Sequence, residues 1–502
     1  MGSVSYLLQG LAEAATGMNL LCCLGGVVAG MLVGVLPGLG PTAGTALLLP
    51  LTFGMEPIQS IVLLAGIYYG AMYGGTITSV LINTPGEAAS VITCMDGYPM
   101  AKQGRAGQAL GVAAIGSFIG GIISLIGLLI LGPSLASQAL KFGPPEFFCL
   151  MLMGLTLVIG LLGKSLVKGL IVAFFGLTLS LIGIDPSVGT VRFAMGNDYL
   201  MNGIDFVSIA MGMFGLVEIF SNLEGDLKEK KVLPKIKGLI PPKEEWGTSM
   251  AAIMRGSFLG FFIGLIPGTN SIIPAVMSYS IEKKLSKHPE RFGHGAIEGV
   301  AGPETANNSY CGGAMIPLFT LGIPTSSVMA VLVGAFVMHG LTPGPRLFSE
   351  QPLLVWTVIG SMFIGNAILL FLNLPLANVW AKVTLVPNRV LFPIITIVAL
   401  LGVYGLNNAM FDVQCMIIFG LVGYIMKKAD FPLAPLLLTF ILGDQMEYTL
   451  VQSMTIFRGD ATQFLRRPIC AVLLAVIVIV LIVSVLSASK RKEVLGTEES
   501  EI

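Results

Sequence analysis

The chain has 502 residues, of which 54% are hydrophobic and 11% are charged, and its 28 basic residues balance 28 acidic ones. A soluble domain usually has about 25% charged residues, so this composition excludes an ordinary soluble protein and indicates one that lies in a lipid bilayer. The zero net charge gives no reason to expect a nucleic-acid partner.

Apolar segments of roughly 17–25 residues, long enough to cross a bilayer, recur along the whole chain. We expect a first interrupted segment at 19–53, followed by spans near 58–82, 108–131, 147–162, 166–184 and 203–220. A second interrupted segment is expected at 251–280, followed by spans near 305–323, 353–374, 390–406, 410–426, 432–446 and 469–486. The sequence therefore predicts an all-α polytopic membrane protein with about 11 to 12 spans.

The two interrupted segments share a sequence element. Residues 30–38 (GMLVGVLPG) return at 260–268 as GFFIGLIPG, with four of nine positions identical and the others apolar in both copies. Each copy breaks an apolar segment with Pro-Gly, which frees backbone groups that lipid cannot satisfy. Paired broken helices in two repeats are typical of the substrate site of a secondary transporter. We therefore predict two repeats of common origin, each with a re-entrant or broken-helix hairpin.

The distribution of Lys and Arg predicts how the two copies are inserted, because cytoplasmic loops collect these residues. Basic residues flank the second interrupted segment on both sides, whereas the first has none nearby, since the first Lys or Arg of the chain is Lys102. The repeats are therefore predicted to be inverted, with the C-terminus in the cytoplasm. We divide the chain into a first membrane repeat (1–222), a cytoplasmic linker (223–248), a second membrane repeat (249–488) and a cytoplasmic tail (489–502), of which residues 493–502 are expected to be unstructured.

Four interrupted stretches, at 37–42, 83–90, 267–271 and 321–327, combine Pro and Gly with small hydroxyl or amide side chains. A helix that starts inside the membrane turns unpaired N–H groups and its positive dipole end toward a cavity, and Ser, Thr and Asn are natural caps there. Such helix starts hold a carboxylate without a buried Lys or Arg. The other reading is that these glycines only allow helices to pack or kink. We predict that the four stretches converge and bind substrate through Gly38, Gly40, Thr42, Pro85, Gly86, Ser90, Gly268, Ser271, Pro324, Thr325 and Ser326.

A cation site is predicted at Asn83, Glu87, Asn307 and Asn308, together with nearby carbonyl groups. An ionisable group in a span is a functional candidate by default. Glu87 either binds a cation or a substrate hydroxyl, or caps the start of a helix. Asn307 and Asn308 either bind a cation or substrate, or form hydrogen bonds between helices. The sequence has no His-Glu-x-x-His or Gly-x-Ser-x-Gly motif, so we predict no enzyme, no cofactor and no metal beyond Na⁺.

Five stretches are similar to one known family: 36–42 (LPGLGPT), 69–75 (YGAMYGG), 83–90 (NTPGEAAS), 96–105 (DGYPMAKQGR) and 302–308 (GPETANN). Over nearly its whole length the chain resembles the large membrane subunit of the tripartite tricarboxylate transporter family. The resemblance implies a symporter of the bacterial inner membrane that imports an organic carboxylate such as citrate. It also implies a driving cation gradient, expected to be Na⁺, and two partners, a small membrane subunit and a periplasmic solute-binding protein.

The chain departs from the family pattern at two positions. Relatives often have glycine after the proline of the fourth stretch, where this chain has Thr325, and a second glycine in the third stretch, where it has Asn270. We expect Asn270 to keep the left-handed turn, because asparagine tolerates that conformation, and Thr325 to change the pocket. The alternatives to a symporter are a carboxylate channel, which needs a continuous polar lining, and a uniporter without ion coupling.

Overall fold

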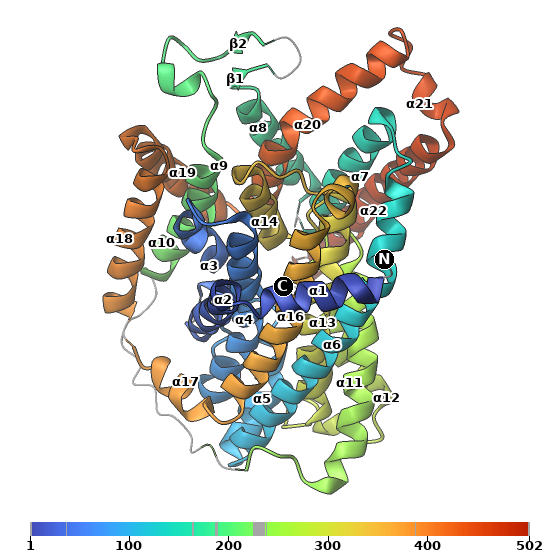
Figure 1. Cartoon of the computed structure of the whole chain (residues 1–502). Helices are drawn as coiled ribbons and strands as arrows, with labels where there is room; N and C mark the ends of the chain where they lie inside the picture. Colours follow the sequence, from blue (N-terminus) through green and yellow to red (C-terminus); the bar gives the residue numbers. More distant parts are fainter. Residues whose placement is uncertain are drawn as a thin grey trace.

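The computed structural model describes residues 3–36, 38–162, 165–185, 189–223, 236, 238–386 and 388–499. These residues are mostly helical (Figure 1), and the two strands among them, β1 (Gly183–Ile184) and β2 (Val191–Arg192), form a short antiparallel pair. Five of the described helices, α2, α4, α6, α16 and α19, are long and apolar enough to cross a membrane, and shorter apolar helices accompany them. The fold is that of an all-α polytopic membrane protein, as predicted; the total of 11 to 12 spans stays a prediction.

The helices of the first half begin with α1, which lies across α16 of the second half (Figure 1). In chain order they are α1 (Ser3–Ala14), α2 (Gly17–Val35), α3 (Gly40–Leu48), η1 (Leu49–Thr52), α4 (Pro57–Ile82), α5 (Val91–Lys102), α6 (Ala106–Ala139), α7 (Pro144–Leu162), α8 (Leu166–Ser180), η2 (Asp198–Leu200), α9 (Phe206–Ala210), the π-helix η3 (Met211–Leu216) and α10 (Val217–Leu223).

The second half begins with the order of elements that follows α1 in the first half: a long helix, a break, a short helix and another long helix. Its helices are α11 (Lys243–Gly264), α12 (Ile272–Leu285), η4 (Pro289–Arg291), α13 (Glu298–Leu321), α14 (Ser327–Met338), α15 (Pro345–Glu350), α16 (Pro352–Asn373), α17 (Ala377–Val383), α18 (Asn388–Asn407), α19 (Met410–Lys428), α20 (Ala434–Ile456), α21 (Gln463–Arg466) and α22 (Pro468–Glu499).

Matching rows of glycine bring the first helices of each repeat into backbone contact. In α2 an added Cβ at Gly30 would lie 2.4 Å from the carbonyl oxygen of Ile67 on α4, and in α11 one at Gly260 would lie 2.1 Å from that of Ala306 on α13. Small residues let membrane helices approach this closely. The Gly-x-x-x-Gly part of the repeated element therefore packs helices in both halves, while the Pro-Gly part ends them.

The two halves exchange their long helices. α6 of the first half packs against α13 of the second, and α16 of the second packs against α4 of the first. α5, which precedes α6, and α17, which follows α16, both lie toward the lower end of Figure 1, so α6 and α16 run in opposite directions. The opposite directions of α6 and α16 are compatible with the predicted inversion of the two repeats, which stays a prediction.

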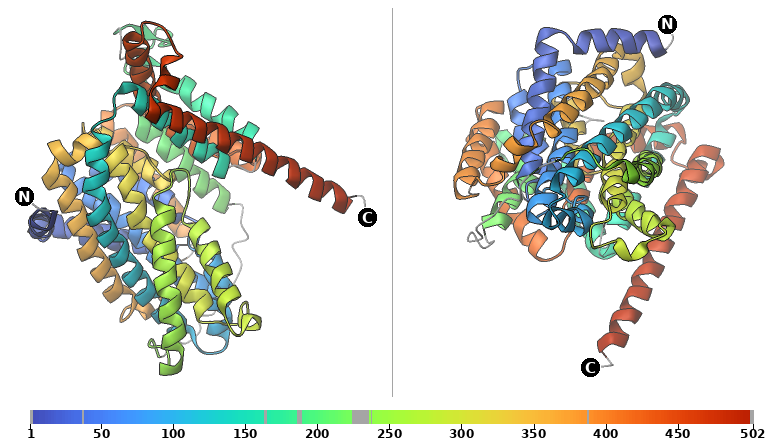
Figure 2. Two further views of the ribbon diagram at one scale, coloured as in Figure 1. Left: turned by 90° about the vertical axis from the view of Figure 1, so that its right-hand side faces the viewer. Right: turned by 90° about the horizontal axis from the view of Figure 1, so that it is seen from below.

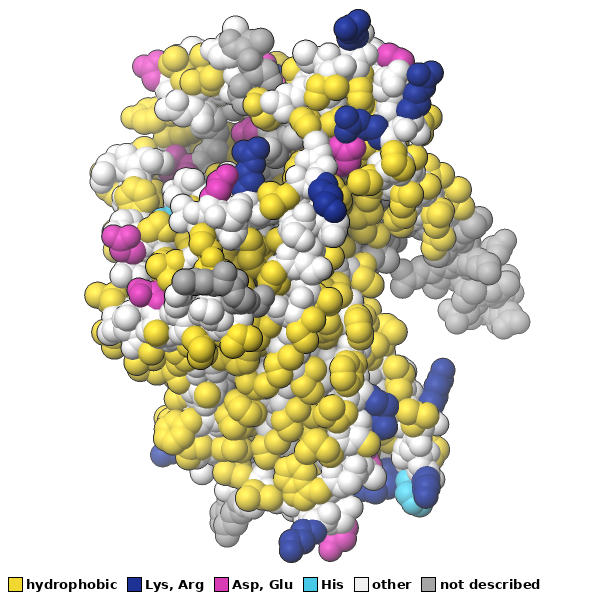
Figure 3. Space-filling model, turned by 45° about the vertical axis from the view of Figure 1, so that its right-hand side comes forward, with side chains coloured by type: hydrophobic (Ala, Val, Ile, Leu, Met, Phe, Trp, Pro, Cys, Tyr) yellow, Lys and Arg dark blue, Asp and Glu magenta, His cyan; other side chains and the backbone are white. Residues whose placement is uncertain are grey.

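On the face shown in Figure 3, hydrophobic side chains cover the middle of the molecule, and Lys and Arg lie above and below this region. The exposed apolar side chains of the molecule include Phe258, Phe262, Leu401 and Ile418. Because a bilayer accepts apolar surface that water does not, the surface agrees with a multi-pass membrane protein.

Two predicted boundaries differ from the structure. α11 begins at Lys243, inside the segment assigned to the linker, because Glu244 and Glu245 suit the first turn of a helix. α22 continues to Glu499 and extends away from the rest of the molecule (Figure 2), so the predicted unstructured tail is helical as far as the structure describes it. The Lys, Arg and Glu residues of that tail are good helix formers and prolong a helix that has already begun. The linker residues 224–235 lie outside the described residues.

Candidate functional site

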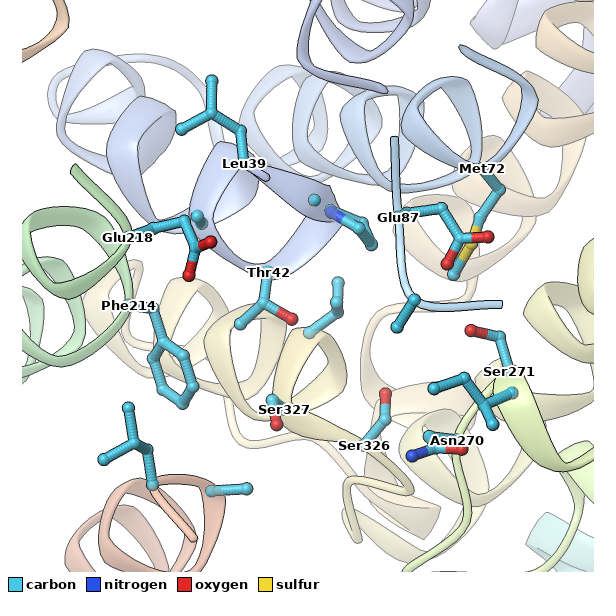
Figure 4. A pocket seen from close by; sticks show the side chains of 18 of the residues that line it. Leu39, Thr42, Met72, Glu87, Phe214, Glu218, Asn270, Ser271, Ser326 and Ser327 are labelled. Atoms are coloured by element: carbon cyan, nitrogen blue, oxygen red, sulfur yellow. The ribbon is translucent and has the colours of Figure 1, made fainter. Parts of the chain in front are cut away.

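The four interrupted stretches line one cavity of about 610 Å³. The side chains of Thr42, Glu87, Ser271 and Ser326, one from each stretch, point toward this common space (Figure 4). Four short helices, α3, α5, α12 and α14, start at the breaks, and the first residues of each line the cavity. The positive ends of four helix dipoles are therefore directed at the same volume, which favours an anion.

The first and third breaks are not equivalent. Gly38 and Gly40 have positive φ angles of 88° and 63°, in the left-handed region that glycine adopts without strain. In the second copy Gly268 has a φ of 80°, but Asn270, at the position that corresponds to Gly40, does not have a positive φ. The expectation of a left-handed Asn270 was wrong, because its side-chain oxygen instead accepts a hydrogen bond from the Ile273 N–H at 3.4 Å and supports the start of α12. Pro37 lies outside the described residues.

Most residues predicted to bind substrate line the cavity, and the others lie behind its wall. The lining set comprises Gly38, Gly40, Thr42, Pro85, Gly86, Ser271 and Ser326. Ser90, Gly268, Pro324 and Thr325 are buried and are not part of the lining.

The residues behind the wall hold the breaks together. The Gly268 N–H donates a hydrogen bond to the Thr325 carbonyl oxygen at 3.1 Å, which joins the third break to the fourth. The Ser90 hydroxyl donates to the Glu87 carbonyl oxygen at 2.8 Å and closes the second break. Thr325 therefore links the third and fourth breaks through its backbone carbonyl oxygen, and its side chain does not line the cavity.

The hydroxyl groups at the helix starts do not cap their own helices. Ser90, Ser271 and Ser326 occupy the N-cap positions of α5, α12 and α14, and none of the three makes a side-chain capping hydrogen bond. The general preference for Ser, Thr and Asn as caps is therefore not expressed as a side-chain capping bond by these three serines. The buried Ser326 hydroxyl has no hydrogen-bond partner among the described residues. Ser271 and Ser326, which line the cavity, thus offer polar groups to a ligand, whereas the Ser90 hydroxyl is bonded to the Glu87 backbone.

Three of the four predicted cation ligands lie together. Glu87 lines the cavity, and its Oε1 lies 3.5 Å from Nδ2 of Asn307. Asn308, the next residue of α13, donates hydrogen bonds to the Ser117 hydroxyl at 2.8 Å and to the Glu304 carbonyl oxygen at 3.0 Å. Asn83 is elsewhere: it is exposed and ends α4 in the left-handed conformation, with a φ of 53°.

Both readings of Glu87 find support in its contacts. Its Oε2 accepts a hydrogen bond from the Ala89 N–H at 2.8 Å, as expected of a carboxylate beside a helix start. Its other oxygen faces Asn307. One oxygen thus holds the backbone of the break while the other remains available to a cation or a substrate hydroxyl.

Glu304 is the acidic residue that sequence reasoning left out of the site. It is fully buried, and its carboxylate accepts hydrogen bonds from the hydroxyls of Thr76 at 2.7 Å and of Thr93, and from Nδ2 of Asn307 at 3.5 Å. Among the described residues, neither Glu87 nor Glu304 forms an ion pair with a Lys or Arg. The spacing of Glu304 and Asn307, three residues apart on one helix face, could have indicated their proximity.

A second wall of the cavity was also not predicted. Met213 and Phe214 of η3, Glu218 of α10 and Lys427 of α19 line it. Nζ of Lys427 lies 2.8 Å from Oε2 of Glu218. The distribution of Lys and Arg along the chain placed Lys427 only at the end of a loop. It could not indicate the contact with Glu218, because Glu218 is far away in the sequence.

Asp96, in a stretch that carries the family resemblance, anchors α5 to the second half. Its Oδ1 accepts hydrogen bonds from the N–H groups of Gly293, Gly295 and Ala296 at 2.8–2.9 Å, and its Oδ2 accepts one from the Tyr279 hydroxyl at 2.9 Å. This buried carboxylate therefore fixes the loop before α13, on which Glu304 and Asn307 lie.

Comparison with known proteins agrees with this architecture. Residues 20–438 match the model of the tripartite tricarboxylate transporter TctA family. The chain is 47% identical over 501 residues, 99% of its own length and 100% of the relative's, to an "Uncharacterized 52.8 kDa protein in TAR-I ttuC' 3'region" of Agrobacterium vitis. It is 48% identical over 237 residues to an "Uncharacterized protein in TAR-II ttuC' 3'region" of the same organism, covering 47% of this chain and 98% of the relative. No solved structure matches significantly. The chain belongs to the tripartite tricarboxylate transporter TctA family, and it is a multi-pass membrane protein of a transporter family.

Proposed function

We propose that this protein imports an organic di- or tricarboxylate by symport with a cation, expected to be Na⁺, as the large membrane subunit of a binding-protein-dependent tripartite transporter. The observation that carries the proposal is the single cavity at which four helix starts meet. Its volume of about 610 Å³ lies within the usual range for small-molecule sites.

The cavity binds the carboxylate of the substrate through helix starts and hydroxyl groups. Backbone N–H groups at the start of a helix point along the dipole axis and favour negative charge. Ser271 and Ser326 add hydroxyl donors at the starts of α12 and α14. An anion is held in this way without the desolvation of a buried lysine or arginine.

Glu87 couples the substrate to the cation. A bare carboxylate on the cavity wall repels an anionic substrate by about 3 kcal/mol at a separation of about 6 Å and an effective dielectric constant of about 20. A cation bound between Glu87, Asn307 and Glu304 removes that repulsion and supplies the missing positive charge beside two buried carboxylates. Oxygen ligands of this kind suit hard cations. Each ligand then raises the affinity for the other by the same factor.

The resemblance to the family supplies the rest of the assembly. We infer a location in the bacterial inner membrane, with the C-terminus in the cytoplasm, a small membrane subunit beside this chain, and a periplasmic solute-binding protein that delivers the substrate. The inverted repeats provide two related units that move relative to each other so that the cavity opens to either side in turn.

Uptake by reconstituted complexes tests the proposal. The chain, its small subunit and the binding protein are reconstituted in liposomes, and the initial rate of citrate uptake is measured with an inward gradient of Na⁺ and with K⁺ in its place. We expect uptake against the citrate gradient only with Na⁺. Equal rates in both media, with citrate never exceeding its external concentration, would contradict symport and indicate a channel or uniporter.

A further inference from the structure

The cavity has two chemically different sides. On one side, Asn270, Ser271 and Ser326 present neutral polar groups at the starts of α12 and α14, and the Glu87 carboxylate, to which the proposed function assigns a cation, lies on the same side (Figure 4). Glu218 lies on the opposite side of the cavity from Asn270 and Ser271 (Figure 4), and Lys427 contacts it there. Lys427 is the one basic residue among the described residues that line the cavity. A substrate with two carboxylates therefore meets a different kind of partner at each of its ends.

The contact between Lys427 and Glu218 is suited to exchange. Nζ of Lys427 lies 2.8 Å from Oε2 of Glu218, and the two side chains are 42% and 25% exposed. Ion pairs that water reaches add little to stability, because water screens them and holding two long side chains costs entropy. An arriving carboxylate can therefore replace Glu218 as the acceptor without destabilising α10 or α19.

We propose that Lys427 binds the second carboxylate of the substrate, and that Glu218 occupies the lysine while the cavity is empty. This inference rests on the proposed carboxylate function and adds the residue that determines specificity. The helix starts recognise one carboxylate of any substrate, whereas Lys427 recognises only a substrate that carries another. The cavity thus prefers di- and tricarboxylates to monocarboxylates.

Binding to the purified full-length chain in lipid nanodiscs tests the inference without the selectivity of a binding protein. Calorimetric titration with succinate, citrate and butyrate in the presence of Na⁺ gives three affinities for each variant. Because Lys427→Gln removes a hydrogen bond to a charged group, we expect it to weaken the binding of succinate and citrate roughly 10-fold or more. The affinity for butyrate should stay unchanged. Glu218→Gln should strengthen succinate and citrate binding, because the lysine loses its competing acceptor.

Lys428→Gln is the matched control. Lys428 is the neighbouring residue, its Nζ lies 5.5 Å from the centre of the Tyr424 ring, and it does not line the cavity. The inference is overturned if Lys427→Gln leaves succinate binding unchanged, or if it weakens butyrate as much as succinate. If the unaltered protein binds none of the three acids, the proposed carboxylate function fails as well, so the two failures are distinguishable.

Discussion

Glu87 and Glu304 lie within reach of the same amide, because Nδ2 of Asn307 is 3.5 Å from an oxygen of each carboxylate. Burying two acidic groups without a basic partner is costly in the interior of a membrane protein. Both carboxylates accept hydrogen bonds, but among the described residues neither has a basic partner. The proposed cation would supply the missing positive charge.

Replacing Glu304 with Gln should remove the cation dependence of uptake. The substitution keeps the size of the side chain and its acceptor for Thr76, but it removes one of the two charges beside Asn307. We expect the initial rate of uptake to fall by roughly 10-fold or more, as for loss of a charged ligand contact, with a flat response to Na⁺ concentration. Glu298→Gln, in the first turn of the same helix, should keep the steep response of the unaltered protein.

Replacing Ser326 with Ala should weaken substrate binding without weakening the fold. Its hydroxyl has no hydrogen-bond partner among the described residues, so its removal leaves no protein group unsatisfied. The KM for uptake should rise several-fold, and the melting temperature of the empty protein should not fall. A large loss of thermal stability with an unchanged KM would show that the hydroxyl serves the fold instead.

The sequence indicates which stretches approach one another at the site, and it is less informative about single side chains. Pro-Gly breaks and small polar residues are local signals, so the four stretches and the proximity of Glu87 to Asn307 follow from them. Asn83 misled the prediction, because its side chain suited a ligand while its backbone serves to end α4. The proximity of Glu304 to Asn307 could have been read from their spacing, but its contact with Thr76 could not. That contact and the pair Glu218–Lys427 depend on helices that meet across the two halves, and no local pattern shows which helices meet.

At the scale of elements, glycine rows decide how close the paired helices come. Gly25 and Gly26 are neighbours on α2, yet an added Cβ at Gly26 would lie 2.3 Å from the Leu63 carbonyl oxygen, whereas one at Gly25 would meet nothing within 4 Å. A backbone atom cannot rotate away as a side chain can. Neighbouring positions on one helix therefore tolerate side chains very differently.

This contrast gives a paired test. Gly26→Ala should push α2 away from α4 and lower the melting temperature of the detergent-solubilised protein, measured by tryptophan fluorescence or light scattering. Gly25→Ala should leave it unchanged or raise it, since alanine is a better helix former than glycine by about 1 kcal/mol. Equal melting temperatures for the two variants would contradict the close contact of α2 with α4.

Asp96 should contribute to stability through the loop before α13. Asp96→Ala leaves three backbone N–H groups and the Tyr279 hydroxyl without their acceptor, and each unsatisfied group costs about 1–3 kcal/mol. We expect a marked fall in melting temperature. Asp460→Ala is the control, because that exposed carboxylate bonds only to nearby residues of its own loop, Thr462 and Gln463, among the contacts described.

At the scale of the whole molecule, the exchanged helices make each half incomplete alone. Asn308 of α13 donates a hydrogen bond to Ser117 of α6, and Tyr73 of α4 donates one to Asn366 of α16 at 2.5 Å. Buried polar groups of this kind need the other half for their partners. The two repeats therefore form one core although the linker divides them in sequence.

A chain cut within residues 224–235 tests this interdependence. We expect the two halves to assemble and transport when they are produced together, and an affinity tag on one half to recover the other. Each half produced alone should be degraded, because α6 and α16 would expose the surfaces that cover α13 and α4. Recovery of either half alone as a stable, monodisperse protein would contradict the exchange.

The accuracy of the predicted spans differs from helix to helix. The span expected at 58–82 corresponds to α4 (Pro57–Ile82). The span expected at 432–446 corresponds to α20 (Ala434–Ile456), which continues farther than predicted. Packing against α7 and α8 stabilises α20, so its polar residues do not end the helix. α1 was not predicted, since a short helix that lies across α16 has no span-like signal.

The difference between Gly40 and Asn270 has a consequence for how a solute is oriented. With identical breaks, a cavity between related repeats would offer a solute two equivalent poses, exchanged by the pseudo-symmetry. Here one wall has two left-handed glycines, and the other has a single one followed by an amide. The two poses of a solute with unlike ends therefore differ in energy, and such a solute is bound more favourably in one orientation than in the other.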